Sequence, residues 1–172
     1  EGKMYNGKPA TDVTSVGARS GSVDAWKTGI TTRGVLIDIP RFRGEPFVTI
    51  EKPVRAWELH DAAAAQGSPL KPGDAVIVYS GRGAYFAANP NAVPGAAPSP
   101  GLHVDTVPYL KENDAAILGW DQMDATPSGY EVFRGLSVHI LTIVFAGMPL
   151  LDNAYLEPLA EACREENRWE FL

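Results

Sequence analysis

Hydrophobic positions along the chain form short β-type runs that alternate with helical stretches. Two β-branched apolar runs, at residues 32–40 and 75–79, predict buried strands, and Pro40 is expected to end the first. Between them, residues 54–66 hold a block of alanines, and Gly67 follows where a helix would end. These segments predict a strand–helix–strand unit.

The alternation continues through the second half of the chain. The pattern there predicts helices at 104–113, 136–146 and 156–167, and strands at 115–120, 148–151 and from Trp169 onward. Residues 1–30 are rich in Gly, Ser and Thr and predict loop with one short helix around 22–27. Residues 87–100, rich in proline and alanine, predict a long loop that serves as a lid or an oligomer arm.

Length and pattern together predict an α/β fold in one domain over residues 1–172. The chain opens at Glu1 in a polar, glycine-bracketed loop, and it closes at 168–172 in a strand-like alternation. We therefore expect it to be a piece of a longer polypeptide, cut at both ends.

Composition excludes several classes of protein. The net charge of −6 and the scattered basic residues disfavour nucleic-acid binding. No apolar run approaches the roughly 20 residues that cross a bilayer, so we expect a water-soluble protein without a membrane partner. The single cysteine, Cys163, lies among apolar residues at helical spacing and is interpreted as a buried structural thiol. A reducing compartment fits this reading, and we expect a cytoplasmic protein.

The chain has three histidines. The first, His60, lies within a predicted helix, and the second, His103, lies where a loop meets a predicted helix. His60 stands beside acidic residues on a helix and is interpreted as a solvated surface residue. His103 follows Pro100-Gly101-Leu102, where the long loop meets a helix N-terminus. There it either faces a cleft as a neutral base or merely caps the helix, and the sequence leaves both readings open.

His139, the third histidine, lies in an apolar helix, where a charged imidazole is costly without a partner. About eight helical residues rise roughly 12 Å, and four or five extended residues return roughly 15 Å. Asp152 can therefore meet His139. The two are ordinary ligands for zinc or manganese. The alternative is a core histidine that is hydrogen-bonded to an aspartate capping the last helix.

Asp121 lies in the polar segment 119–129, directly after a predicted buried strand. Ligands of open α/β folds bind at the carboxyl ends of strands, so this carboxylate is expected to point into a cleft. Turn formation alone would also account for the acidic residues of this segment.

Several segments in sequence order resemble the putative cyclase family, which includes bacterial kynurenine formamidases and isatin hydrolases. The segments that carry the resemblance are 2–7, 32–41, 73–82, 101–103, 151–153 and 168–172. The resemblance implies a swivelling β/β/α fold, with a mixed sheet or partial barrel flanked by helices, that assembles as a homodimer or higher oligomer. It also implies metal-dependent hydrolysis of a C–N bond in an amide, formamide or lactam, or of a related ester, in a small-molecule substrate.

Family members carry an H-x-G-T-H-x-D-x-P-x-H motif upstream of the position of Glu1, and no residue here matches it. His139 and Asp152 resemble the later histidine and acidic residue that complete a second metal position. Asp152 replaces the more usual Glu, and the spacing is one residue longer than in formamidases. His103 and Asp121 match positions near the substrate cleft and are the catalytic candidates.

Two other functions compete with the hydrolase. A degenerate family member without the metal motif would act as a binding or oligomerisation module. An unrelated nucleotide-binding α/β protein is a weaker alternative, because the chain has no glycine-rich phosphate loop.

Overall fold

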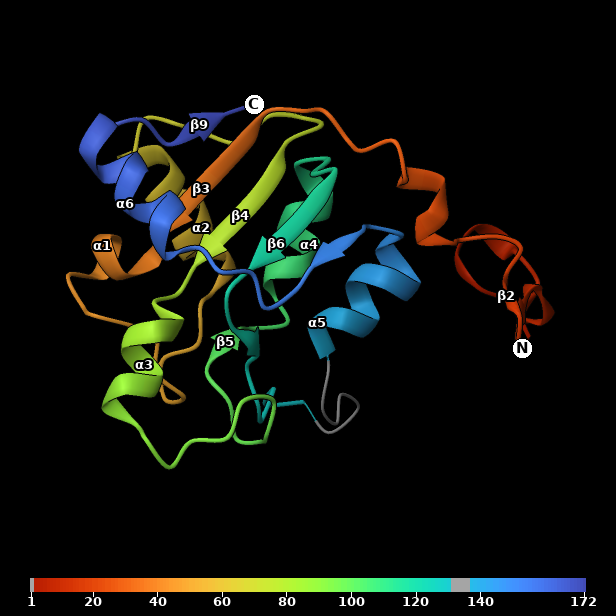
Figure 1. Cartoon of the computed structure of the whole chain (residues 1–172), viewed down its shortest axis with the longest axis horizontal. Coiled ribbons are helices and arrows are strands. Elements are labelled where there is room, and N and C mark those ends of the chain that lie inside the picture. The colour runs from red at the N-terminus through yellow and green to blue at the C-terminus, as the bar shows by residue number, and fades with distance from the viewer. Residues whose placement is uncertain (1, 131–136) are drawn as a thin grey trace.

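A computed structural model describes residues 2–130 and 137–172, and its centre is a five-stranded sheet (Figure 1). In spatial order the strands are β8 (Leu150–Leu151), β6 (Ile117–Trp120), β4 (Ala75–Tyr79), β3 (Gly34–Asp38) and β9 (Glu170–Phe171). The first four run parallel, and β9 pairs antiparallel with β3. The predicted α/β class with a mixed sheet is confirmed.

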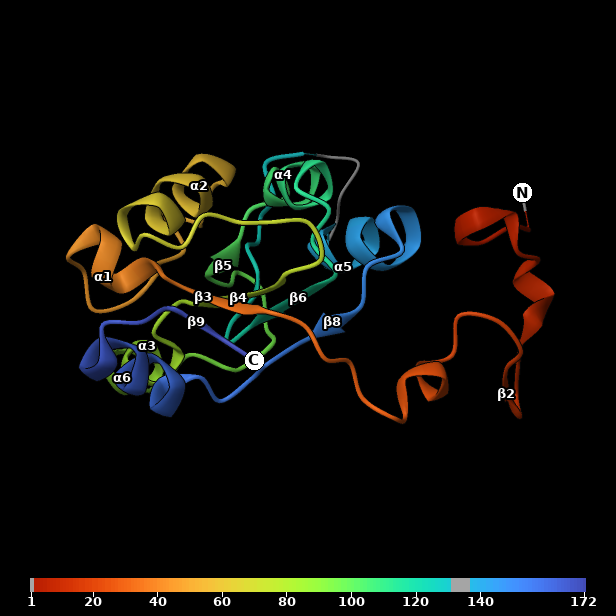
Figure 2. The same ribbon diagram turned by 90° about the horizontal axis from the view of Figure 1, so that it is seen from above.

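Helices cover both faces of this sheet (Figure 2). One layer holds α1 (Ile39–Arg43), α2 (Ala56–Ala65), α4 (Thr106–Glu112) and α5 (Ser137–His139), and the other holds α3 (Arg82–Ala88) and α6 (Glu157–Glu166). Successive residues of β3 point to opposite faces, so Val35 packs in the core on the α2 side and Leu36 in the core on the α6 side. Cys163 is buried in the second core, as predicted.

The first predicted strand ends earlier than expected. Strand β3 stops at Asp38, whose Oδ1 accepts a hydrogen bond from the main-chain N–H of Arg41 at 2.9 Å. Asp38 therefore caps α1, and Pro40 lies in the first turn of that helix. Proline is well tolerated there, because the first N–H groups of a helix have no partner within it. The prediction that Pro40 simply ends a strand is wrong.

The predicted helix 136–146 is regular α-helix only at its start. Its first residue, Leu136, lies outside the described residues; α5 covers Ser137–His139, and a π-helix, η4 (Ile140–Ala146), follows. Several apolar side chains of η4 are exposed, Phe145 by 67%. This segment lies beside edge strand β8 (Figure 2), so only part of its surface faces the core.

Several short elements escaped prediction. They include α1, α3, short elements within residues 2–30, and the strands β5 (Gly101–Leu102) and β7 (Met123–Asp124), which pair with each other in parallel. A strand of two residues is too short to show a periodic pattern. The remaining predicted helices and strands are present, with ends shifted by a few residues. No helix in the described part of the chain is long and apolar enough to cross a membrane.

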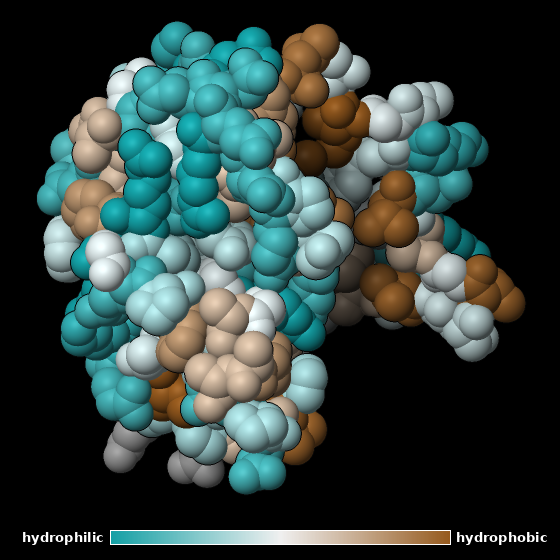
Figure 3. All heavy atoms as spheres, turned by 60° about the vertical axis from the view of Figure 1, so that its left-hand side comes forward, coloured by the Kyte–Doolittle hydropathy of each residue, from teal (hydrophilic) through white to brown (hydrophobic). Residues whose placement is uncertain are grey.

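Residues 2–30 extend away from the sheet as an arm (Figure 1). The arm consists of η1 (Tyr5–Gly7), η2 (Ala10–Asp12), the hairpin of β1 (Val13–Thr14) and β2 (Gly17–Ala18), and η3 (Val23–Trp26). The aromatic ring of Tyr5 lies against Gly147, where an added Cβ would meet it at 2.2 Å. Apolar side chains gather on the arm, including Val13, Val16 and Val23, whereas the face over α6 is mostly hydrophilic (Figure 3).

Candidate functional site

Polar residues follow three neighbouring parallel strands at the same edge of the sheet. Ser80 comes directly after β4, Asp121 after β6 and Asp152 after β8. The carboxyl ends of parallel strands form the usual ligand-binding edge of an open α/β sheet. The sequence therefore places two carboxylates where ligand chemistry is expected.

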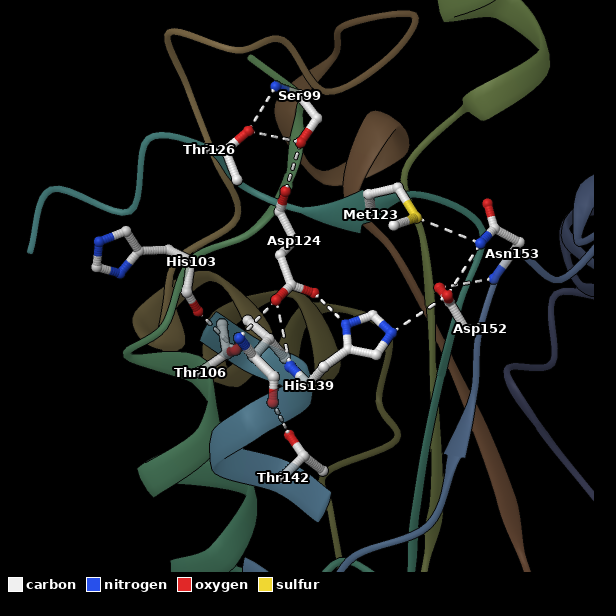
Figure 4. A network of polar contacts seen from close by, with 11 residues as sticks. Ser99, His103, Thr106, Met123, Asp124, Thr126, His139, Thr142, Asp152 and Asn153 are labelled. Carbon is white, nitrogen blue, oxygen red and sulfur yellow. Dashed lines mark hydrogen bonds and ion pairs between the residues drawn. The ribbon is translucent and has the colours of Figure 1, made fainter. Parts of the chain in front are cut away.

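His139 and Asp152 meet at this edge (Figure 4). His139 ends α5, and its Nε2 lies 3.2 Å from Oδ2 of Asp152. The predicted meeting of the two residues is confirmed. The alternative that Asp152 caps the last helix is wrong, because α6 begins at Glu157 with Leu156 at its cap position.

A second carboxylate, that of Asp124, lies on the other side of the His139 ring. Asp124 Oδ1 lies 2.7 Å from His139 Nδ1, and Oδ2 accepts hydrogen bonds from the main-chain N–H groups of Val138 at 2.7 Å and His139 at 3.2 Å. Asp124 is 1% exposed, and burial raises the pKa of its carboxyl. The sequence offered turn formation as an account of the acidic residues of 119–129, Asp124 among them, and gave Asp124 no other role. The available signal was its place in the polar segment after β6.

Asp152 is held from the side opposite to His139 by its neighbour. The main-chain N–H of Asn153 donates to Asp152 Oδ1, and the Asn153 amide Nδ2 donates to Oδ2, both at 2.9 Å. The same Nδ2 lies 3.3 Å from the sulfur of Met123, and Arg82 donates to the Asn153 side-chain oxygen. The carboxylate therefore has a defined orientation towards the imidazole.

The spacing of this pair fits a metal ion. Zinc lies about 2.0–2.2 Å from histidine nitrogen and carboxylate oxygen, so two ligands on one ion lie roughly 3.0–3.4 Å apart at angles between about 90° and 110°. The 3.2 Å between His139 Nε2 and Asp152 Oδ2 falls within that range. Within 2–130 and 137–172, no group of three or more His, Cys, Asp or Glu side chains could hold a metal ion. The pair supplies two ligands.

Asp121 has a different position from the one that the sequence suggested. Its side chain is fully buried and accepts hydrogen bonds from the main-chain N–H groups of Ser80 at 2.8 Å and Arg82 at 3.0 Å. Burial raises its pKa to about 6. The expectation that this carboxylate points into a cleft is wrong, because the N–H groups of the turn after β4 need an acceptor and Asp121 provides it. A catalytic role for Asp121 stays an untested prediction.

His103 lies apart from the His139 pair, with its ring pointing away from His139 (Figure 4). The ring is buried; Nδ1 accepts a hydrogen bond from the main-chain N–H of Asp105, and Nε2 lies 3.1 Å from the carbonyl oxygen of Ser128. His103 also lines a cavity of about 790 Å³, whose wall includes Trp57. Its catalytic role stays a prediction. His60 is on the surface beside Asp61, as predicted.

A smaller cavity of about 300 Å³ lies under the proline-rich loop. Residues 89–100 contain no helix, and the predicted loop is confirmed for this part; Ser99 fixes its end through hydrogen bonds to Asp124 and Thr126. The cavity is lined by loop residues, by Gln122 and Met123, and by Ile50 and residues of α3. Met123 also contacts Asn153, the neighbour of Asp152, but neither His139 nor Asp152 lines the cavity.

Two comparisons with known proteins agree on one family. The family model described as "Putative cyclase" matches residues 10–126. A crystal structure of a novel cyclase resembles the whole chain, with a TM-score of 0.82 and 28% sequence identity. The match covers 100% of this chain and 57% of the chain in that structure, so this chain spans little more than half of its relative's length. The search of curated proteins found no match.

Proposed function

This chain belongs to the putative cyclase family, and on that basis we propose that it carries part of the active site of a metal-dependent hydrolase. The proposed reaction is the cleavage of a C–N bond in an amide, formamide or lactam, or of a related ester. The observation that supports it is the approach of His139 Nε2 to Asp152 Oδ2 at the carboxyl end of the sheet.

His139 and Asp152 would hold the metal ion, zinc or manganese, with one nitrogen and one oxygen donor. A divalent cation supplies a Lewis acid that polarises a carbonyl group and lowers the pKa of water. Catalytic zinc sites commonly use three protein ligands, so the pair needs at least one more. The family resemblance assigns the remaining ligands to the histidine- and aspartate-rich motif.

The 300 Å³ cavity beside Met123 is the place for a small-molecule substrate. Its volume is at the lower end of the range for ligand pockets, about 300–1,000 Å³, which favours a compact substrate. The loop 89–100 covers it in the manner of a lid. Assembly as a homo-oligomer and a cytoplasmic location belong to the same proposal.

Metal content and activity test the proposal together. The natural full-length protein is expected to contain zinc or manganese by mass spectrometry and to hydrolyse N-formylkynurenine, isatin or a simple lactone. His139→Ala and Asp152→Asn should each lower both metal content and activity. His60→Ala, a surface substitution, is the matched control and should change neither. A folded full-length protein that is metal-free and inert refutes the hydrolase and favours the degenerate binding module.

A further inference from the structure

We propose that Asp124 is a positioning residue, which fixes the His139 ring in one orientation and one tautomer for the candidate metal centre. The inference rests on the proposed function, because it concerns the same pair of metal ligands. Asp124 itself lies on the far side of the imidazole from Asp152 and reaches the centre only through His139 (Figure 4).

The two carboxylate oxygens of Asp124 have separate tasks. Oδ1 contacts the ring at Nδ1, and Oδ2 receives the main-chain N–H groups of Val138 and His139. One carboxylate therefore fixes both the backbone that carries the imidazole and the rotation of the ring itself. The ring also lies edge-on to Trp120, with centroids 5.3 Å apart and planes at 75°, which restricts it further.

Asp124 is rigid in turn. Its carbonyl oxygen accepts a hydrogen bond from the Ser99 hydroxyl at 2.6 Å, and it is paired with Leu102 in the parallel strands β7 and β5. Asp124 is 1% exposed, so water does not compete with these hydrogen bonds. The orientation of His139 is thus determined by the sheet rather than by the helix alone.

The tautomer follows from donor and acceptor chemistry. An ionised carboxylate only accepts hydrogen bonds, so a proton must lie on His139 Nδ1 to complete the 2.7 Å contact. Nε2 is the nitrogen directed at Asp152. By the same rule it carries a proton towards Asp152 Oδ2, 3.2 Å away, while no metal is bound, and a cation that binds there would replace this proton, whereas Nδ1 keeps its proton towards Asp124. Carboxylates commonly orient metal-binding histidines in this way, and their loss lowers metal affinity about 10- to 100-fold.

The alternative is that Asp124 only caps the start of α5 and does not determine the tautomer of His139. The variant Asp124→Asn distinguishes this capping role from the positioning role. The asparagine keeps the size and one oxygen. The main-chain N–H groups of Val138 and His139 can only donate, so they still need an acceptor. The His139 ring can donate or accept at Nδ1 according to its tautomer. The side-chain oxygen of the asparagine should therefore face the two N–H groups. The amide NH₂ then faces Nδ1 and forces the proton onto Nε2, towards the cation position.

The test combines ¹⁵N NMR of the histidine rings with zinc titration, both on the natural full-length protein, because the pair of His139 and Asp152 alone supplies two ligands. We expect a proton on His139 Nδ1 in the native protein, no proton on Nδ1 in Asp124→Asn, and a zinc affinity about 10- to 100-fold lower in the variant. Asp38→Asn is the matched control, since Asp38 is also a buried aspartate that caps a helix, α1; its zinc affinity should stay native.

An unprotonated Nδ1 in the native protein refutes the positioning role, and this measurement holds even if the variant does not fold. A folded Asp124→Asn protein with native tautomer and native zinc affinity refutes it as well. If the natural full-length protein binds neither zinc nor manganese, the proposed hydrolase fails, while the tautomers still decide the role of Asp124.

Discussion

Arg43 and Glu58 form a buried ion pair in which two guanidinium nitrogens donate to the two carboxylate oxygens, each at 2.7 Å. Glu58 Oε2 also accepts the main-chain N–H of Arg55 at the start of α2. Arg43 in turn donates to the carbonyl oxygens of Lys52 and Pro53. The pair joins the end of α1 to the start of α2 and forms part of the wall of the 790 Å³ cavity.

Glu58→Gln should lower the free energy of unfolding by about 3–5 kcal/mol, because it leaves the Arg43 guanidinium buried without its counter-charge. Urea denaturation measures the change. Lys52→Met breaks the pair of Lys52 with Glu45. The Lys52 side chain is 63% exposed, so this change should lower the free energy of unfolding much less than Glu58→Gln does. Equal losses in the two variants would contradict the assigned burial of the Arg43–Glu58 pair.

Asp121 predicts a specific dependence of stability on pH. Its pKa is raised from 3.8 to about 6 in the folded protein, so between about pH 4 and 6 the folded state binds more protons than the unfolded state. Its contribution to the free energy of unfolding therefore falls as the pH rises through that window, by an amount on the order of 3 kcal/mol.

Asp121→Asn removes this titration. The variant loses one main-chain hydrogen bond and is expected to be less stable at low pH, but its free energy of unfolding should fall less between pH 4 and 6. Urea denaturation at several pH values measures the slope. Asp24→Asn, an exposed carboxylate paired with Lys27, serves as control and should keep the native slope. A native slope in Asp121→Asn would show that another group titrates there.

Gly101 lies in β5 with φ at +154°, and a Cβ there would stand 1.6 Å from the carbonyl oxygen of Met123 in β7. Gly101→Ala should therefore separate β5 from β7 and cost several kcal/mol, more than the roughly 1–2 kcal/mol of backbone strain alone. Gly95→Ala isolates that strain, since Gly95 has φ at +78° and open space around it. Thermal unfolding of the two variants measures the difference, and similar melting temperatures would contradict the close approach of the strands.

The exposed apolar side chains of η4 bear on the predicted homo-oligomer. Ile143 and Phe145 are 52% and 67% exposed. If this surface contributes to self-association, Phe145→Glu should shift the sedimentation coefficient towards that of a monomer, because a charge is costly in an apolar contact. Val16→Glu places a charge on an apolar residue of the arm that is 95% exposed and is the control. An unchanged oligomer in Phe145→Glu excludes this surface.

Sequence periodicity predicted the central strands and the larger helices because each buries several apolar residues at regular spacing. It could not predict β5 and β7, whose two residues each are held by tertiary pairing. The pairing of His139 with Asp152 followed from helix rise and strand length. The contribution of Asp124 did not, because it depends on β7 lying beside α5, a tertiary relationship that no local pattern encodes.

Asp121 shows a second limit of sequence reasoning. A carboxylate after a buried strand was assigned to ligand chemistry by its place at the sheet edge. Main-chain N–H groups of the turn after β4 lie at the same edge, and those of Ser80 and Arg82 donate hydrogen bonds to the Asp121 carboxylate. Whether Asp121 binds a ligand or accepts hydrogen bonds from the turn depends on the path of the main chain after β4, which the sequence pattern does not give.

The π-helix η4 lies between the two candidate metal ligands and bears on their separation along the chain. A π-helical turn closes hydrogen bonds one residue further along than an α-helical turn and so takes up an additional residue. The resemblance to formamidases implies a His139–Asp152 spacing that is one residue longer here, and the wider turn of η4 is a place where one additional residue fits while the two side chains remain 3.2 Å apart. By this argument a deletion of one residue within η4 would return the segment to an ordinary α-helix and leave His139 and Asp152 within reach of each other.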